Sequence, residues 1–210
     1  MSDADLRELE RKFRETGAVE DEAAWFRERL RVGEVAQGTL RIKDRTFEVT
    51  EATLDGYLEQ DGQLLWEVGV STSPREFDGE VWQPGVYGGD LLRLPIATVL
   101  DLPGTEVVPE GDLFLDVFEQ EAVTNSVWRF LDLAGSRLWV RWTGLCCVGW
   151  CEEYSDDLEL VVETGLHFGG IKARIYDEEK AVEVLSKTLD PSQFVRTRIA
   201  GAPGFVLPES

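Results

Sequence analysis

The sequence predicts an α+β protein that is mostly β: an antiparallel β-rich body with an N-terminal helical hairpin and one late helix. Changes in the spacing of apolar residues predict this class. Apolar residues recur at helical spacing over residues 1–31, and they alternate with polar residues from Gly38 onward. Helical spacing returns once, near residues 177–189. We therefore divide the chain into a hairpin, residues 1–34, and a body, residues 35–210, which contains the late helix.

The hairpin is predicted as two helices joined near Gly17. Ser2 is the expected N-cap of the first helix, and glycine commonly follows a helix C-terminus. Acidic residues at 20–22 favour the start of the second helix because they complement its dipole, and Gly33 ends it. The apolar positions of the two helices are Leu6, Leu9, Phe13, Ala23, Phe26 and Leu30. We expect the hairpin to cap one face of the sheet; the alternative is that it docks a partner.

Short runs rich in Val, Trp, Phe and Thr, separated by Gly, Pro and Asp turns, predict the strands of the body. The predicted strands are Leu40–Ile42, Phe47–Val49, Leu64–Thr72, Asp112–Phe118, Ser126–Leu133, Arg137–Thr143 and Leu158–Phe168. A turn at Lys43-Asp44 joins the first two, and Ala134-Gly135-Ser136 joins two longer strands. Pro191 ends the late helix, and the Gly- and Pro-rich tail over residues 201–208 is expected to be irregular.

The strand predicted at Arg137–Thr143 carries bulky residues on both faces. Leu138, Val140 and Trp142 share one face, and Trp139 lies on the other. Two-sided apolarity predicts a strand that is buried on both faces; the alternative is that one face is kept for a partner.

The formal net charge of -20 on 210 residues constrains the function most strongly. Residues 94–128 and 142–171 contain no Lys or Arg, and acidic residues are frequent in both stretches. Such stretches repel nucleic acid and anionic membranes, and they attract basic partners. We therefore expect a basic protein partner, no nucleic acid and no membrane.

The sequence predicts neither a signal peptide nor a membrane span. The first 14 residues are charged throughout, and no window approaches the roughly 18 apolar residues that a membrane span requires. The three cysteines are an odd number and lie close together, unlike a secreted disulfide framework. We therefore expect a soluble, cytoplasmic protein.

Four residues are candidates for metal or thiol chemistry: Cys146, Cys147, Cys151 and His167. Zinc needs four converging ligands, but adjacent strand residues point to opposite faces, so Cys146 and Cys147 should not share one ion. The acidic surroundings would also raise a thiol pKa and disfavour a catalytic thiolate. The run Gly85–Asp90 lacks the Lys-Ser/Thr of a phosphate loop and is expected to be a turn. We expect no metal site, no cofactor and no catalytic residue.

These observations favour a non-enzymatic acidic module that binds a basic protein, as an immunity protein or a nucleic-acid-mimicking inhibitor does. The predicted partner-binding residues are Glu152, Glu153, Tyr154, Asp156, Asp157, Asp116, Glu119 and Glu121. An exposed aromatic side chain among the acids would anchor the interface. The alternatives are a hydrolase built on paired carboxylates and an assembly subunit that uses the N-terminal hairpin.

Overall fold

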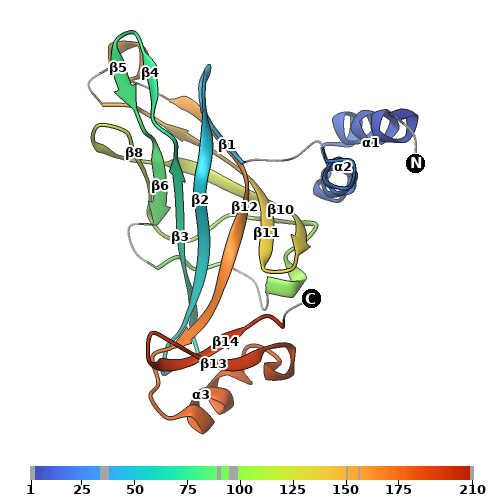
Figure 1. Cartoon of the computed structure of the whole chain (residues 1–210), viewed down its shortest axis with the longest axis vertical. Coiled ribbons are helices and arrows are strands. Elements are labelled where there is room, and N and C mark those ends of the chain that lie inside the picture. The colour runs from blue at the N-terminus through green and yellow to red at the C-terminus, as the bar shows by residue number, and fades with distance from the viewer. Residues whose placement is uncertain are drawn as a thin grey trace.

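The computed structural model describes residues 3–33, 38–88, 91–94, 99–149, 151–155 and 157–208. Strands take up 51% of the chain and helices 21%, which confirms an α+β protein that is mostly β. Two helices precede the sheet and one lies late in the chain, as the sequence predicts (Figure 1). No helix among the described residues is long and apolar enough to cross a membrane.

The helices are α1 (Asp3–Thr16), α2 (Val19–Arg31) and α3 (Glu178–Leu185). Gly17 directly follows α1, and Gly33 follows the C-cap residue of α2, Val32; their φ angles of 63° and 76° are a left-handed conformation that glycine adopts without strain. The expected N-cap Ser2 lies outside the described residues. The late helix is shorter than predicted and begins after Asp177, whose carboxylate accepts a hydrogen bond from the Lys180 N–H.

Fourteen strands are seen in the described part of the chain. They are β1 (Thr39–Ile42), β2 (Arg45–Leu58), β3 (Leu64–Thr72), β4 (Arg75–Phe77), β5 (Glu80–Trp82), β6 (Gly85–Gly88), β7 (Thr105–Val107), β8 (Leu113–Asp116), β9 (Gln120–Ala122), β10 (Thr124–Ala134), β11 (Arg137–Cys146), β12 (Leu158–Ala173), β13 (Val195–Ile199) and β14 (Ala202–Val206). Short 3-10 helices lie at Val99–Asp101, Glu152–Tyr154 and Pro191–Gln193.

Twelve of these strands form one sheet, and β4 and β5 pair separately. The order along the sheet is β7-β10-β11-β12-β1-β2-β3-β6-β8-β9, and β14 joins β12 to β13. The pairings are antiparallel, except that β2 also pairs in parallel with β12. The predicted turns at Lys43-Asp44 and at residues 134–136 are confirmed, since each joins two neighbouring antiparallel strands.

The strand β1 separates β2 from β12 over only part of their length. It pairs with β12 at residues 160–163 and with β2 at residues 45–48. Beyond β1, the two long strands pair directly with each other, starting at Thr53 and His167. Figure 1 shows this arrangement, with β1 beside the upper part of β2 and β12. The strands β2 and β12 are therefore direct neighbours in one part of the sheet and are separated by β1 in the other.

Large aromatic residues fill the main core. Trp66, Trp82 and Trp128 are 0% exposed, and Trp142 is 1% exposed. Trp128 and Trp142 oppose each other on β10 and β11 with ring centroids 5.0 Å apart. Each tryptophan removes roughly 150–250 Å² of surface from water, which makes these residues large contributors to stability.

The hairpin covers the second face of β10 and β11. Leu138, Val140 and Trp142 belong to the main core, whereas Trp139 packs in a separate cluster with Phe26 and Leu131. The Phe26 and Trp139 ring centroids are 5.4 Å apart. The prediction that the strand at Arg137–Thr143 is buried on both faces is therefore confirmed, and α2 is the element that covers its second face.

Two predictions about glycine-rich segments are wrong. Residues 85–88 of the predicted turn Gly85–Asp90 form β6, while Gly89 and Asp90 lie outside the described residues. The tail predicted to be irregular forms β14 and the end of a hairpin with β13. Buried Val86 and Phe205 hold these strands in place, and packing against the core therefore outweighs the local preference of Gly and Pro for turns.

Candidate functional site

The two acidic stretches meet in space, although they are distant in sequence. A Cβ placed on Gly149 would lie 2.8 Å from Glu121 Oε1 and 3.2 Å from Glu119 Oε2, so these side chains rest on the loop after β11. Glu121 and Asp157 also line one cavity of about 260 Å³, together with Thr124 and Ser155. We call this region the acidic end, made up of Asp116, Glu119, Glu121, Glu152, Glu153 and Asp157. The predicted site residue Asp156 lies outside the described residues.

The carboxylates of the acidic end differ from other acidic residues in their ion pairing. None of the six forms an ion pair with another described residue. Acidic residues on the sheet behave differently: Glu159 pairs with Arg41 at 2.8 Å, and Glu106 pairs with Arg129 at 2.7 Å. The six carboxylates of the acidic end therefore lack the ion pairs that these two acidic residues of the sheet form.

An exposed aromatic side chain lies among these acids, but it is not the predicted one. Tyr154 is 3% exposed and forms part of the core. Phe118, in the turn between β8 and β9, is 41% exposed, and its ring lies 5.4 Å from the ring of Trp82. Phe118 was predicted to end the strand Asp112–Phe118, and its exposure was not predicted. The available signal was its place between the acidic residues Asp116 and Glu119.

A buried arginine, Arg45, contacts several of the elements that carry the acidic end. Arg45 is 8% exposed, and its guanidinium carbon lies 4.1 Å from the Trp82 ring centroid, 4.5 Å from Tyr154 and 4.7 Å from Phe77. Its Nη2 donates to Asp78 Oδ2 at 3.0 Å. One cation thus contacts β5, the β4–β5 turn and the 3-10 helix that carries Glu152 and Glu153.

Tyr154 adds a second link beside this arginine. Its hydroxyl donates a hydrogen bond to Asp44 Oδ1 at 2.6 Å, which lowers the pKa of that carboxyl. Burial, followed by the same hydrogen bond, raises the pKa of Tyr154. The turn between β1 and β2 is therefore tied to the acidic end.

The candidate metal and thiol residues do not come together. On the β11–β12 ladder, His167 pairs with Arg137 and Cys146 pairs with Leu158, at opposite ends. No group of three or more metal-ligating side chains occurs among the described residues. Burial, followed by the neighbouring Cys147, raises the pKa of the Cys146 thiol to about 12, which disfavours a nucleophilic thiolate there.

One pair of carboxyl groups bears on the hydrolase alternative. Asp55 on β2 lies directly opposite Glu67 on β3. Burial, and then the charge of Glu67, raises the pKa of Asp55. The Tyr57 hydroxyl donates to Glu67 Oε2 at 2.6 Å, and this bond raises the pKa of Tyr57 to about 12. The two carboxyl groups thus differ in environment, as an acid–base pair requires.

The raised pKa of Asp55 predicts that its ionised form destabilises the fold. Because the folded pKa exceeds the ordinary value of 3.8, the stabilising contribution is present below that pH and is lost as pH rises through the folded pKa. We expect Asp55→Asn to raise the free energy of unfolding by about 0.5–1 kcal/mol at pH 7, with no gain below pH 3.8. Urea unfolding across this pH range, with exposed Glu51→Gln as the control, measures the effect. A loss of stability in Asp55→Asn at pH 7 would contradict it.

Comparison with known proteins does not assign the chain to a family. No family model matches the sequence, and neither a curated protein nor a solved structure is significantly similar to it.

Proposed function

We propose that the acidic end binds a basic protein partner, in the manner of an immunity protein or a nucleic-acid-mimicking inhibitor. The observation that carries this proposal is the convergence of the two stretches without Lys or Arg, which meet where Glu119 and Glu121 contact Gly149. Clustered charge of one sign steers an oppositely charged protein and speeds its association. The proposal therefore concerns the rate of encounter as well as the affinity.

The distribution of charge along the chain supports one acidic end rather than a uniformly acidic surface. From Lys172 to the last residue, six basic residues balance six acidic ones. Figure 1 places α3, β13 and β14, which belong to this balanced segment, at the opposite end of the molecule from β4, β5 and β8. A basic partner is thus attracted to one end of the sheet.

Phe118 supplies the apolar contact that a charged surface lacks. Buried aromatic anchors carry a large share of the binding energy of many protein interfaces, whereas exposed charges on the rim contribute mainly to the rate of association. Phe118 is half-buried against Trp82 and flanked by acids, so a partner can cover it at modest entropic cost. We expect Phe118 to control dissociation and the carboxylates to control association.

The test compares two variants that each remove three negative charges. The first changes Glu119, Glu152 and Glu153 to Gln, and the control changes Glu178, Glu179 and Glu183 of α3 to Gln. All six residues are exposed. Partners are captured from an extract of the native host with the wild-type chain, identified by mass spectrometry, and measured by surface plasmon resonance. We expect the association rate of the first variant to be about ten-fold lower than that of the wild type, and the rate of the control variant to be unchanged. The wild-type association rate should also fall about ten-fold when the salt concentration is raised from about 50 to 500 mM.

Phe118→Ala tests the apolar contact independently of the charges. It should raise the dissociation rate of the partner and leave its association rate unchanged. The proposal would be refuted by an acidic partner or by an association rate that does not depend on salt concentration. Equal effects of the two triple variants on association would also refute it.

A second candidate function, a carboxylate-based hydrolase, is favoured by one observation: the opposed Asp55 and Glu67 with a raised Asp55 pKa. Turnover of a small molecule that Asp55→Asn abolishes would favour it over the binding module. The assembly alternative has less support, because the hairpin residues Ala23 and Phe26 are 2% and 4% exposed and are covered by their own chain.

A further inference from the structure

The strand β13 is an open edge of the sheet. It pairs with β14 alone, and it lies with β14 and α3 at the end of the molecule opposite β4 and β5 (Figure 1). Val195, Arg196, Thr197 and Arg198 are exposed, and Ile199 is half-buried. Since residues that alternate along a strand lie on opposite faces, β13 is accessible from both faces.

The hairpin geometry determines which backbone groups of β13 point outward. Ala200 and Gly201, with φ angles of 49° and 84°, form a two-residue turn between the paired residues Ile199 and Ala202. In such a hairpin the pair next to the turn exchanges both backbone hydrogen bonds, and every second pair along the ladder does the same. The backbone groups of Ile199 and Thr197 are therefore used within the hairpin.

The backbone N–H and C=O groups of Arg196 and Arg198 consequently point away from β14. Pro203 lies opposite Arg198 and has no N–H, which agrees with a pair that exchanges no ladder bonds. Within the described residues, no hydrogen bond is made to the outward groups of these two arginines. Four backbone groups are thus arranged to receive another strand.

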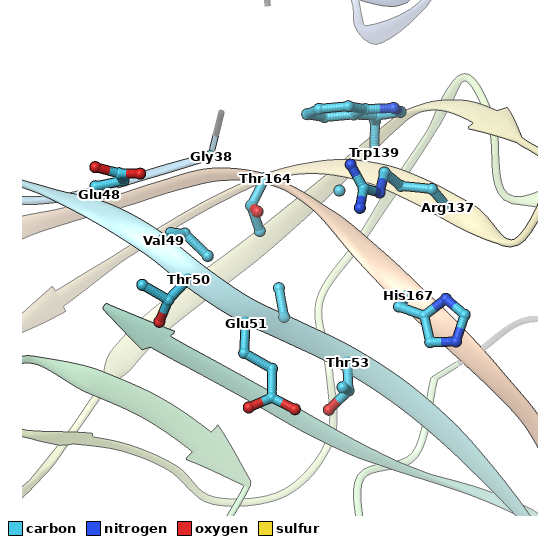
Figure 2. A pocket seen from close by; sticks show the side chains of 12 residues that line it. Gly38, Glu48, Val49, Thr50, Glu51, Thr53, Arg137, Trp139, Thr164 and His167 are labelled. Carbon is cyan, nitrogen blue, oxygen red and sulfur yellow. The ribbon is translucent and has the colours of Figure 1, made fainter. Parts of the chain in front are cut away.

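The cavity of about 550 Å³ between β2 and β12, shown in Figure 2, offers no such open edge. Gly38 lies between the two strands there and accepts the Val49 N–H at 2.9 Å. A Cβ on Gly38 would lie 2.7 Å from the Thr164 Cβ and 3.1 Å from the Val49 Cβ, so the space between the strands is filled. The edge of β13 is therefore the better place for strand addition.

The side chains beside the outward backbone groups are basic. Arg196 and Arg198 are two residues apart and thus share one face of β13. Arg198 forms no ion pair with a described residue, and its Nη1 donates to the Gly201 carbonyl at 3.1 Å. Arg196 lies 3.7 Å from Glu179, but both side chains are exposed, so this ion pair contributes little.

The two arginines disfavour a second copy of the chain at this edge. If two β13 strands paired along their full length in antiparallel orientation, Arg196 of each copy would face Arg198 of the other. Like charges directly opposite each other destabilise a sheet, and charged edge strands prevent such pairing in many proteins. Carboxylates at the same opposing positions would instead stabilise the added strand.

We propose that the open edge of β13 binds an extended acidic peptide segment, which adds to the sheet as a further antiparallel strand. Two acidic residues of the segment, two positions apart, lie opposite Arg196 and Arg198 and pair with their guanidinium groups. The backbone of these acidic residues bonds to the outward N–H and C=O groups of the arginines. This site selects the opposite charge from the acidic end, so it does not depend on the function proposed above.

The first test compares two short peptides by calorimetry near physiological salt. The probe is acetyl-Val-Glu-Thr-Glu-Val-amide, and the matched probe carries Gln in place of both Glu. We expect the Gln peptide to bind about five- to ten-fold more weakly, because two cross-strand ion pairs are lost while the backbone is unchanged. Equal affinities for the two peptides would overturn the proposal.

Hydrogen exchange tests the strand addition itself. In the free protein the amides of Arg196 and Arg198 should exchange faster than that of Thr197, and the acidic peptide should slow the exchange of the two arginine amides. Methylation of both Glu nitrogens of the peptide, which face β13, should abolish binding, whereas methylation of its Thr nitrogen, which faces away, should have a smaller effect. Binding without protection of the two arginine amides would show that charge alone attracts the peptide, and it would overturn the proposal.

Variants then assign the contacts. Arg196→Gln together with Arg198→Gln should weaken the acidic peptide about five- to ten-fold and leave the Gln peptide unchanged. The control is Lys180→Gln together with Lys187→Gln, which removes two exposed positive charges on and next to α3. Full affinity in the arginine double variant, with folded protein by circular dichroism, would exclude this site.

Arg198→Pro tests the outward backbone group separately from the charge. It removes an N–H that the fold does not use, so the protein should stay folded and bind the acidic peptide more weakly than Arg198→Gln does. Equal binding by these two variants would contradict strand addition. Dimerisation of the unchanged chain that Arg198→Pro abolishes, measured by sedimentation, would show that a second copy occupies the edge instead.

Discussion

Arg45→Ala is expected to lower the free energy of unfolding by about 2–4 kcal/mol. The guanidinium carbon of Arg45 lies within 4.7 Å of three aromatic ring centroids and is almost fully buried. Removing it leaves a cavity between the rings and also removes their contacts with a cation. Chemical unfolding followed by circular dichroism measures the loss.

Three further variants show which property of Arg45 matters. Arg45→Met keeps most of the volume without the charge, and Arg45→Lys keeps the charge without the planar group that stacks on the rings. We expect both to lose less stability than Arg45→Ala. Arg75→Ala is the control, because exposed Arg75 lies 5.0 Å from the Phe77 ring, one of those that Arg45 contacts. If Arg45→Ala costs no more than Arg75→Ala, burial among the rings is not the source of the stability.

The same substitution should affect the proposed interface. Arg45 contacts Tyr154, which belongs to the 3-10 helix with Glu152 and Glu153, and it contacts Trp82, against which Phe118 packs. Loosening these aromatic residues would allow the acids and Phe118 to move apart. The near-ultraviolet circular dichroism of the buried tryptophans should therefore weaken in Arg45→Ala even where the protein stays folded.

The sequence predicted those parts of the fold that depend on local pattern. Period-two alternation identified the strands around Leu64–Thr72 and Arg137–Thr143, and glycine at residues 17 and 33 marked the helix ends. It did not predict β6 or β14, because glycine and proline favour turns unless packing overrides them. Here Val86 and Phe205 are buried and provide that packing.

The sequence did not predict which residues of the acidic end come together or which of its aromatic side chains is exposed. The charge pattern indicated which stretches are acidic, but only the fold shows that Glu121 and Asp157 share a cavity. Nothing in the sequence indicates that Tyr154 is buried while Phe118 is exposed. Both residues lie near acids in sequence, and their difference is set by contacts with Arg45 and Trp82, more than 30 residues away.

Glu22 is the residue whose loss should separate the hairpin from the sheet. Its side chain is 1% exposed, and its two oxygens accept hydrogen bonds from Arg129 at 2.9 Å and Arg141 at 2.8 Å. The two arginines oppose each other on β10 and β11, so they would repel each other without this carboxylate between them. One buried carboxylate on α2 thus bridges two cations on the sheet, and each cation also has a second acidic partner, Glu106 or Glu163.

Glu22→Ala is expected to lower the free energy of hairpin docking by about 2–4 kcal/mol. The loss is smaller than for a fully buried ion pair, because both arginines are about 30% exposed and can reach water. Exposed Glu20→Ala, on the same helical turn, should cost less than about 0.5 kcal/mol. Helical and β signals in circular dichroism melts, together with hydrogen exchange of α2 amides, measure docking separately from unfolding of the sheet. Equal losses in the two variants would show that the ion pairs do not hold the hairpin.

Deleting residues 1–33 tests whether the body folds without the hairpin. Phe26, Leu131 and Trp139 form a cluster separate from the main core, so the deletion should leave a β-rich protein that unfolds cooperatively. The deletion should lower the free energy of unfolding because it exposes Leu131 and Trp139 and removes Glu22 from Arg129 and Arg141. The two arginines still keep Glu106 and Glu163 as partners. Loss of cooperative unfolding would mean that the hairpin is part of the main core. In that case Glu22→Ala should destabilise the whole sheet, and the helical and β signals should melt together.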